Sequence, residues 1–177
     1  RIRGELTEVT EQHALLDVDA LTYAVLVPAA DVPTLLGKIG QSIEFYTLHY
    51  FEGLSQGNTI TPRLIGFTNE RDRAFFELFT TVKGIGNRKA LRALIRPFME
   101  TATAIANRDS EALTSLPEIG TRSAETIIAQ LHGKVVLVTG AAGSVGSELT
   151  RQIAGFDPSL LVLIDHAENP LFFLEAE

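Results

Sequence analysis

The sequence contains no cysteine, which excludes a disulfide framework, a thiolate nucleophile and any zinc site built on thiolates. No apolar run reaches the roughly 18 residues that a membrane-spanning helix needs, so the sequence predicts a protein without such a span. Apolar residues make up 45% and charged residues 21% of the chain, which is typical of a folded globular protein. A reducing, cytoplasmic setting fits the lack of cysteine. No initiator methionine or signal peptide precedes Arg1, and we interpret the N-terminus as trimmed.

The formal net charge of −7 argues, on average, against a nucleic-acid-binding protein. The charge is uneven, however, because five cations and no acid lie between Lys83 and Arg96. Such a stretch in an acidic chain creates a local positive field. It has two interpretations, which are a solvated helix face and a surface that binds phosphates. The residues that precede the cations favour the second.

Three changes of pattern divide the chain. Short alternating runs over residues 2–9, 13–18, 23–27, 42–50 and 63–67 predict strands, and the longest loop between them is Glu52–Pro62. We therefore expect an OB-like β-barrel over residues 1–67. Apolar residues at helical spacing predict a helical domain over 68–133, and a strand–turn–helix–strand pattern predicts a Rossmann-type βαβ fragment over 134–177. The fold class is thus a multidomain α+β protein.

The helical domain contains an internal repeat, because Val82–Ala90 aligns with Leu116–Ala124 at an offset of 34 residues. Each copy carries Ile-Gly followed by three polar residues and alanine, which predicts tandem helix-hairpin-helix motifs. A glycine turn leading into a helix N-terminus offers backbone amides and a partial positive charge to a phosphate. The alternative is a helix corner that needs glycine only for packing. The predicted DNA-binding residues are Lys83, Gly84, Ile85, Gly86, Asn87, Arg88, Lys89, Ile119, Gly120, Thr121, Arg122 and Ser123.

Residues 1–133 resemble the RuvA family of bacterial subunits that bind Holliday junctions. The resemblance lies in the opening RIRGEL, in IGF at the end of the predicted barrel, and in the two hairpins VKGIGNRKA and LPEIGTRSAETIIAQL. It implies a homotetramer that holds a four-way DNA junction open in recombination and repair. It also implies a RuvB-like ATPase partner that drives branch migration, although the domain that contacts this partner is not expected within residues 134–177.

Two features depart from that family's pattern. Glu118 stands where the second hairpin usually has glycine, and a carboxylate beside a phosphate should weaken that clamp. The family also carries an acidic pin on a barrel loop, at the centre of the junction, and the candidate here is Glu52. The loop around Glu52 is longer than the family's loop, so the sequence leaves open whether this residue separates DNA strands at the junction.

A glycine-rich turn follows the first strand of residues 134–177 and opens a helix, which is the context of a dinucleotide-binding fingerprint. Asp165 ends the next strand, 19 residues after Gly146, where it could accept hydrogen bonds from a ribose. This unit resembles the start of the extended short-chain dehydrogenase/reductase family, and especially nucleotide-sugar 4,6-dehydratases of polysaccharide biosynthesis. The resemblance implies weak NAD or NADP binding over residues 140–165. The candidate cofactor-binding residues are Gly140, Gly143, Ser144, Val145, Gly146 and Asp165.

No catalytic residue is predicted. The Tyr-x-x-x-Lys pair of the dehydratases has no match, since no tyrosine has lysine four residues later, and the four histidines show no metal-ligand spacing. The main hypothesis is a RuvA-like, non-catalytic DNA-binding subunit that needs no cofactor to bind DNA. The alternatives are a fragment of an NAD(P)-dependent nucleotide-sugar dehydratase or epimerase, and an oligomerisation module without a ligand.

Overall fold

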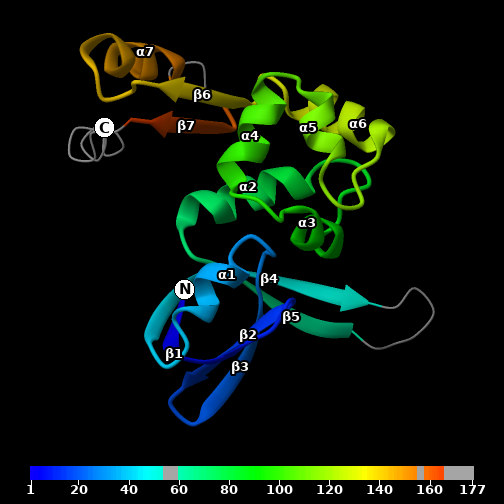
Figure 1. Cartoon of the computed structure of the whole chain (residues 1–177), viewed down its shortest axis with the longest axis vertical. Coiled ribbons are helices and arrows are strands. Elements are labelled where there is room, and N and C mark those ends of the chain that lie inside the picture. The colour runs from blue at the N-terminus through cyan, green and yellow to red at the C-terminus, as the bar shows by residue number, and fades with distance from the viewer. Residues whose placement is uncertain (54–59, 155–157, 166–177) are drawn as a thin grey trace. The chain divides into compact units, whose positions relative to one another are not determined.

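The computed structural model describes residues 1–53, 60–154 and 158–165. Its N-terminal part is a closed barrel in the strand order β1-β2-β3-β5-β4, and the neighbouring strands are antiparallel except for the parallel pair β3–β5 (Figure 1). The strands are β1 (Ile2–Val9), β2 (His13–Val18), β3 (Leu21–Leu26), β4 (Ser42–Gly53) and β5 (Ile60–Phe67). The predicted N-terminal barrel is therefore confirmed.

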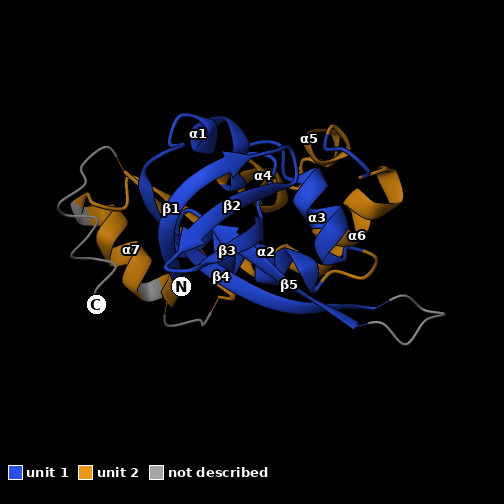
Figure 2. Ribbon diagram, turned by 90° about the horizontal axis from the view of Figure 1, so that it is seen from below, with its two compact units in different colours: residues 1–81, 85–98, 116–118 blue, residues 82–84, 99–115, 119–177 orange. Residues whose placement is uncertain are grey.

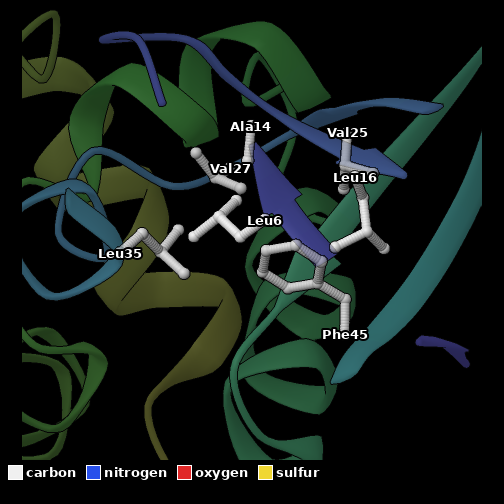
Figure 3. Packing of buried hydrophobic residues seen from close by; sticks show 7 residues of the cluster. All are labelled: Leu6, Ala14, Leu16, Val25, Val27, Leu35 and Phe45. Atoms are coloured by element: carbon white, nitrogen blue, oxygen red, sulfur yellow. The ribbon is translucent and has the colours of Figure 1, made fainter. Parts of the chain in front are cut away.

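Apolar side chains, which alternate with polar ones along the strands, fill the interior of the barrel. In strand β2, Ala14 and Leu16 point inward and are fully buried, while the other residues of the strand are at least partly exposed. A short helix, α1 (Val32–Leu36), which the sequence did not predict, adds Leu35 to this core. Figure 3 shows the cluster, whose buried members are Leu6, Ala14, Leu16, Val25, Val27, Leu35 and Phe45.

Strands β4 and β5 extend further than the sequence pattern predicted. Their pairing continues to Gly53 and Ile60, so both ends of the predicted Glu52–Pro62 loop belong to strands. Residues 54–59 lie outside the described part of the chain. The register places Tyr50 opposite Arg63, and Glu52 lies two residues further along β4. Because side chains two apart share a face of a sheet, Glu52 and Arg63 lie on the same face.

Helices α2 (Glu70–Thr80) and α3 (Asn87–Ala93) follow the barrel. The side chain of Asn69 accepts a hydrogen bond from the Asp72 amide at 2.8 Å, which caps α2 at its first turn. Phe67 of β5 contacts Phe76 of α2, with ring centroids 5.1 Å apart. These contacts fasten α2 to the end of strand β5.

Two backbone hydrogen bonds fix α3 to the barrel chain. The amides of Ala29 and Ala30, just after β3, donate to the carbonyls of Leu91 and Leu94 at 3.3 and 2.9 Å. Helix α3 ends before Pro97, as expected from the missing amide of proline, and α4 begins at Phe98. The barrel thus sets the position of α3, which begins at the first predicted hairpin.

Three helices follow: α4 (Phe98–Ala106), α5 (Ser110–Thr114) and α6 (Thr121–Leu131). Asp109 caps α5 by accepting from the Ala112 amide at 2.9 Å. The fully buried side chains of this part include Ile105, Leu113 and Ile127. Each of the three helices therefore buries an apolar side chain, as the 3.6-residue periodicity predicts.

The last described segment is a strand–helix–strand unit of β6 (Val135–Thr139), α7 (Ser144–Ala154) and β7 (Leu160–Ile164). The two strands are parallel, and Val135 pairs with Leu160. Their connection through α7 confirms the predicted βαβ fragment. Residues 166–177, which follow Asp165, lie outside the described part of the chain.

The chain forms two compact units (Figure 2). The first comprises residues 1–81, 85–98 and 116–118, and the second comprises 82–84, 99–115 and 119–177. Both hairpins cross from one unit to the other within their turns, so the predicted division into 1–67, 68–133 and 134–177 stays a prediction. Among the described residues, no helix combines the length and apolarity that crossing a bilayer requires.

Candidate DNA-binding surface

The two hairpins repeat one backbone geometry at the 34-residue offset. Gly84 has φ +85°, and its counterpart Glu118 has φ +62°, so both adopt the left-handed conformation. Gly86 and Gly120 are both extended, with φ/ψ of −91°/170° and −84°/174°, and each immediately precedes a helix. Because the N-cap residue of each helix is glycine, it has no side chain that could cap the first amides. Each turn therefore leaves backbone donors available to an external acceptor such as a phosphate.

The predicted hairpin residues fall into two groups. The side chains of Ile85 and Ile119 are only 3% exposed, and their predicted role in DNA binding stays a prediction. The Lys83 backbone amide donates to the Gln130 side chain at 3.1 Å, while the rest of Lys83 is exposed. The exposed members are Lys83, Gly84, Gly86, Arg88, Gly120, Thr121 and Arg122, and the half-buried ones are Asn87, Lys89 and Ser123.

Glu118 is the counterpart of a glycine, and its carboxylate is bound within the chain. Arg92 of α3 contacts it through two nitrogens, with Nε to Oε1 at 2.7 Å and Nη2 to Oε2 at 3.2 Å. This two-point geometry matches the planar guanidinium to the carboxylate. The carboxylate is therefore paired with a cation. The expectation that Glu118 weakens phosphate binding by the second hairpin stays a prediction.

Glu52, the candidate acidic pin, is bound by two arginines. Its Oε2 atom accepts from Arg63 Nε at 3.1 Å and from Arg88 Nη2 at 2.7 Å, and Arg88 Nε also contacts Oε1. The hydrogen bonds from Arg88 hold the pKa of Glu52 below its usual value, with a smaller contribution from Arg63. A pocket of about 300 Å³ adjoins this cluster and is lined by residues that include Tyr50, Arg63, Arg88 and Arg92. The negative charge of Glu52 is thus compensated by the two arginines.

The sequence missed Arg63 and Arg92 as members of this surface. Arg92 lies in the basic stretch, but its partner Glu118 is 26 residues away. Arg63 follows Pro62 in a run that the sequence identified only as a strand. The register of β4 on β5 was the missing information, since a strand pairing that continued to Gly53 would have placed Glu52 beside Arg63.

The glycine-rich turn brings most of the predicted cofactor residues together. Gly140 has φ +66°, and a Cβ on Gly146 would collide with the carbonyl oxygen of Gly140, so each position requires glycine. The Asp165 Oδ2 atom accepts a hydrogen bond from the Ala142 amide at 2.9 Å. Val145 is 80% exposed, and Ser144 begins α7. The acid at the end of β7 therefore lies directly at the turn.

Histidines do not form a metal site in the described ranges, which contain no group of three or more potential His, Cys, Asp or Glu ligands. His13 lies 3.1 Å from the Thr10 hydroxyl through Nδ1, and His132 Nδ1 lies 3.3 Å from Arg108 Nη2. The first contact joins residues three apart in the sequence, and the second joins residues 24 apart. His166 lies outside the described residues.

Two family models match separate parts of the chain, and one relative aligns with nearly all of it. The family model described as "SAM-like Helix-hairpin-helix tandem" matches residues 76–132, and the model described as "Polysaccharide biosynthesis protein" matches residues 136–177. The "Holliday junction branch migration complex subunit RuvA" of Rhodopirellula baltica is 36% identical over 172 residues, covering 95% of this chain and 83% of the relative. The protein of the same name from Desulforapulum autotrophicum is 33% identical over 146 residues, covering 82% and 67%.

Proposed function

The chain belongs to the RuvA family of Holliday junction branch migration complex subunits, and we propose that it binds four-way DNA junctions through its two hairpins. The observation that carries the proposal is the repeated turn geometry at Gly84–Gly86 and Glu118–Gly120, within the matched tandem of hairpins. We further propose that four copies assemble around the junction in the cytoplasm and that a RuvB-like ATPase moves the DNA.

The binding chemistry follows from the exposed groups. Backbone amides of the turns donate to phosphate oxygens, and Lys83, Arg88 and Lys89 neutralise phosphate charge. Such contacts position a protein on DNA without reading its sequence. Preference for a junction over duplex then comes from symmetry, because four subunits meet four arms. No covalent step and no cofactor is needed for this binding.

The test is a gel-shift titration of the full chain with a four-way junction and with duplex DNA of equal length, at several salt concentrations. We expect tighter binding to the junction and a loss of affinity with added salt, because phosphate contacts release counterions. Equal affinity for the two DNAs would contradict junction recognition. The absence of binding to either DNA at low salt would instead favour an oligomerisation module.

Glu118 offers a first prediction. Glu118→Gly should raise junction affinity, because it removes a carboxylate beside the second turn and releases Arg92. The free energy of unfolding should change by less than about 1 kcal/mol, since relief of the left-handed strain offsets the lost exposed ion pair. Junction titration and urea unfolding measure the two effects. Glu118→Gln is the matched control, because it removes the charge and keeps the strained backbone; unchanged affinity in both variants would rule out an electrostatic handicap.

We propose a second, weaker function for residues 140–165, which is binding of NAD or NADP. The residues fit the cofactor in part. The glycine turn would accept the pyrophosphate, and the Asp165 carboxylate, which lies at this turn, would accept from the ribose. The cofactor supplies hydride chemistry when bound, but this chain offers no matching Tyr-x-x-x-Lys pair. Calorimetry should give a dissociation constant weaker than about 100 µM, because few contacts offset the cost of ordering the ligand. Micromolar binding, or turnover of a UDP-sugar, would contradict this expectation.

A further inference from the structure

Arg88 is one of the exposed cations of the first hairpin, yet it is already bound in the free protein. It is the second residue of α3, and 66% of its side chain is exposed. Its guanidinium binds Glu52 of β4 through Nη2 and Nε. A carboxylate and a phosphate present similar oxygen acceptors to a guanidinium fork. The Glu52 carboxylate therefore occupies the same donors that a DNA phosphate would use.

Glu52 does not depend on Arg88 alone. Its Oε2 atom also accepts a hydrogen bond from Arg63 Nε. Arg63 belongs to strand β5, which pairs with β4. Only 20% of the Glu52 side chain is exposed, so a complete loss of partners would leave a half-enclosed carboxylate uncompensated. With Arg63 in place, Arg88 can leave without that penalty. Exposed ion pairs contribute little net stability, which makes the exchange of partners easy.

We propose that Glu52 is an internal counterion that holds Arg88 against the barrel in the free protein and is displaced from it by a DNA phosphate, while Arg63 retains Glu52. Arg63 and Glu52 thereby become positioning residues for DNA binding, and neither needs to touch DNA. This inference rests on the junction binding proposed above. It assigns Glu52 a role distinct from that of an acidic pin, which would act on DNA strands directly.

The exchange has a consequence for salt dependence. When Arg88 moves from Glu52 to a phosphate, one ion pair is broken for each one formed, and added salt weakens both. The wild-type protein should therefore show a shallower salt slope than a variant whose Arg88 is unpaired. The difference should be at most about one unit, the value for a single phosphate contact.

The test is a double-mutant cycle of Glu52→Gln and Arg88→Ala in the full chain, with junction binding as the readout. Glu52→Gln should tighten binding roughly two- to fivefold, the range expected for release of one exposed ion pair, and should steepen the salt slope. Arg88→Ala should weaken binding more in the Glu52→Gln background than in the wild type, because Arg88 then binds phosphate without first leaving Glu52. Glu8→Gln is the charge-matched control, since Glu8 is an exposed barrel residue.

Each outcome decides between the alternatives. If Glu52→Gln has the same effect with and without Arg88, Glu52 acts on DNA independently, and the counterion role is wrong. If Glu52→Gln weakens binding, Glu52 holds Arg88 in its DNA-binding position, and the exchange is also wrong. If Glu8→Gln tightens binding equally, the effect is one of net charge. If the wild type binds no junction at low salt, the proposed function itself fails. Thermal unfolding of each variant shows whether the barrel remains folded, and Glu52→Ala repeats the cycle if the glutamine retains Arg88.

Discussion

Replacing Arg88 and Lys89 together by alanine is expected to weaken junction binding by roughly tenfold or more and to lower the salt slope by up to about two units. Both residues lie in the first turn of α3, next to Gly86. Two lost phosphate contacts would remove two sets of released counterions, and the contribution of Arg88 is reduced by the ion pair with Glu52 that it leaves on binding. The affinity loss should be similar for junctions of different sequence, because phosphates carry no sequence information. A gel-shift titration at several salt concentrations measures affinity and slope in the same experiment.

A matched double replacement distinguishes the hairpin from a general loss of charge. Arg3 and Lys134 are exposed cations outside both hairpins, and changing both to alanine removes the same charge. This control should lose less affinity than the Arg88/Lys89 variant. Arg122→Ala should also lose less, because the second hairpin carries Glu118. If the hairpin variant retains both its affinity and its salt slope, the basic stretch is a solvated face and the DNA-binding assignment is wrong.

Asp31→Asn is expected to stabilise the protein by roughly 2–4 kcal/mol at pH 8 and by little below pH 4. Asp31 precedes α1, but its side chain does not cap that helix, and its buried Oδ2 atom has no hydrogen-bond partner among the described residues. Burial, together with the nearby charge of Asp72 and against a lowering by Lys38, raises the pKa of Asp31 from 3.8 to about 7. The folded state therefore binds the proton more tightly than the unfolded state does.

The sign of the pH dependence follows from that difference. A raised pKa in the folded state gives stability that is present below the unfolded value near 4 and is lost as the pH rises to about 7. Asparagine cannot ionise, so the variant should keep the stability that the wild type loses. Urea unfolding at pH 4 and pH 8 tests this, with Glu5→Gln as an exposed control. A gain of equal size at both pH values would show that ionisation of Asp31 is not its cause.

Local pattern was enough to predict most elements of the fold. Strands β1 and β2 have the predicted bounds, because alternation and a turn signal are properties of a few neighbouring residues. The internal repeat placed Glu118 opposite Gly84, and the left-handed backbone at both positions agrees with that alignment. Likewise, the acid at the end of β7 lies at the glycine turn, because parallel strands place their carboxyl ends at one edge.

Pairings between distant residues could not be predicted in this way. The Glu52–Arg88 contact spans 36 residues and depends on the length of the β4–β5 pairing and on the position of α3. Glu52 and Gly53 resemble the start of a loop in sequence, although strand β4 continues to Gly53. The sequence around Asp31 did not predict its burial either, since that burial arises from tertiary packing and not from its neighbours in the chain.

The two hydrogen bonds from Ala29 and Ala30 to α3 have a further consequence for how the protein opens. Helix α3 has only seven residues, which is too short to persist alone in water. The helix therefore depends on contacts with the barrel for its stability. We expect the amide hydrogens of α3 and of the barrel to exchange with solvent together, as those of one cooperative unit. An isolated helical segment beginning after residue 67 would lack the donors for the Leu91 and Leu94 carbonyls. We therefore expect α3, and with it the helix of the first hairpin, to be lost when the barrel unfolds.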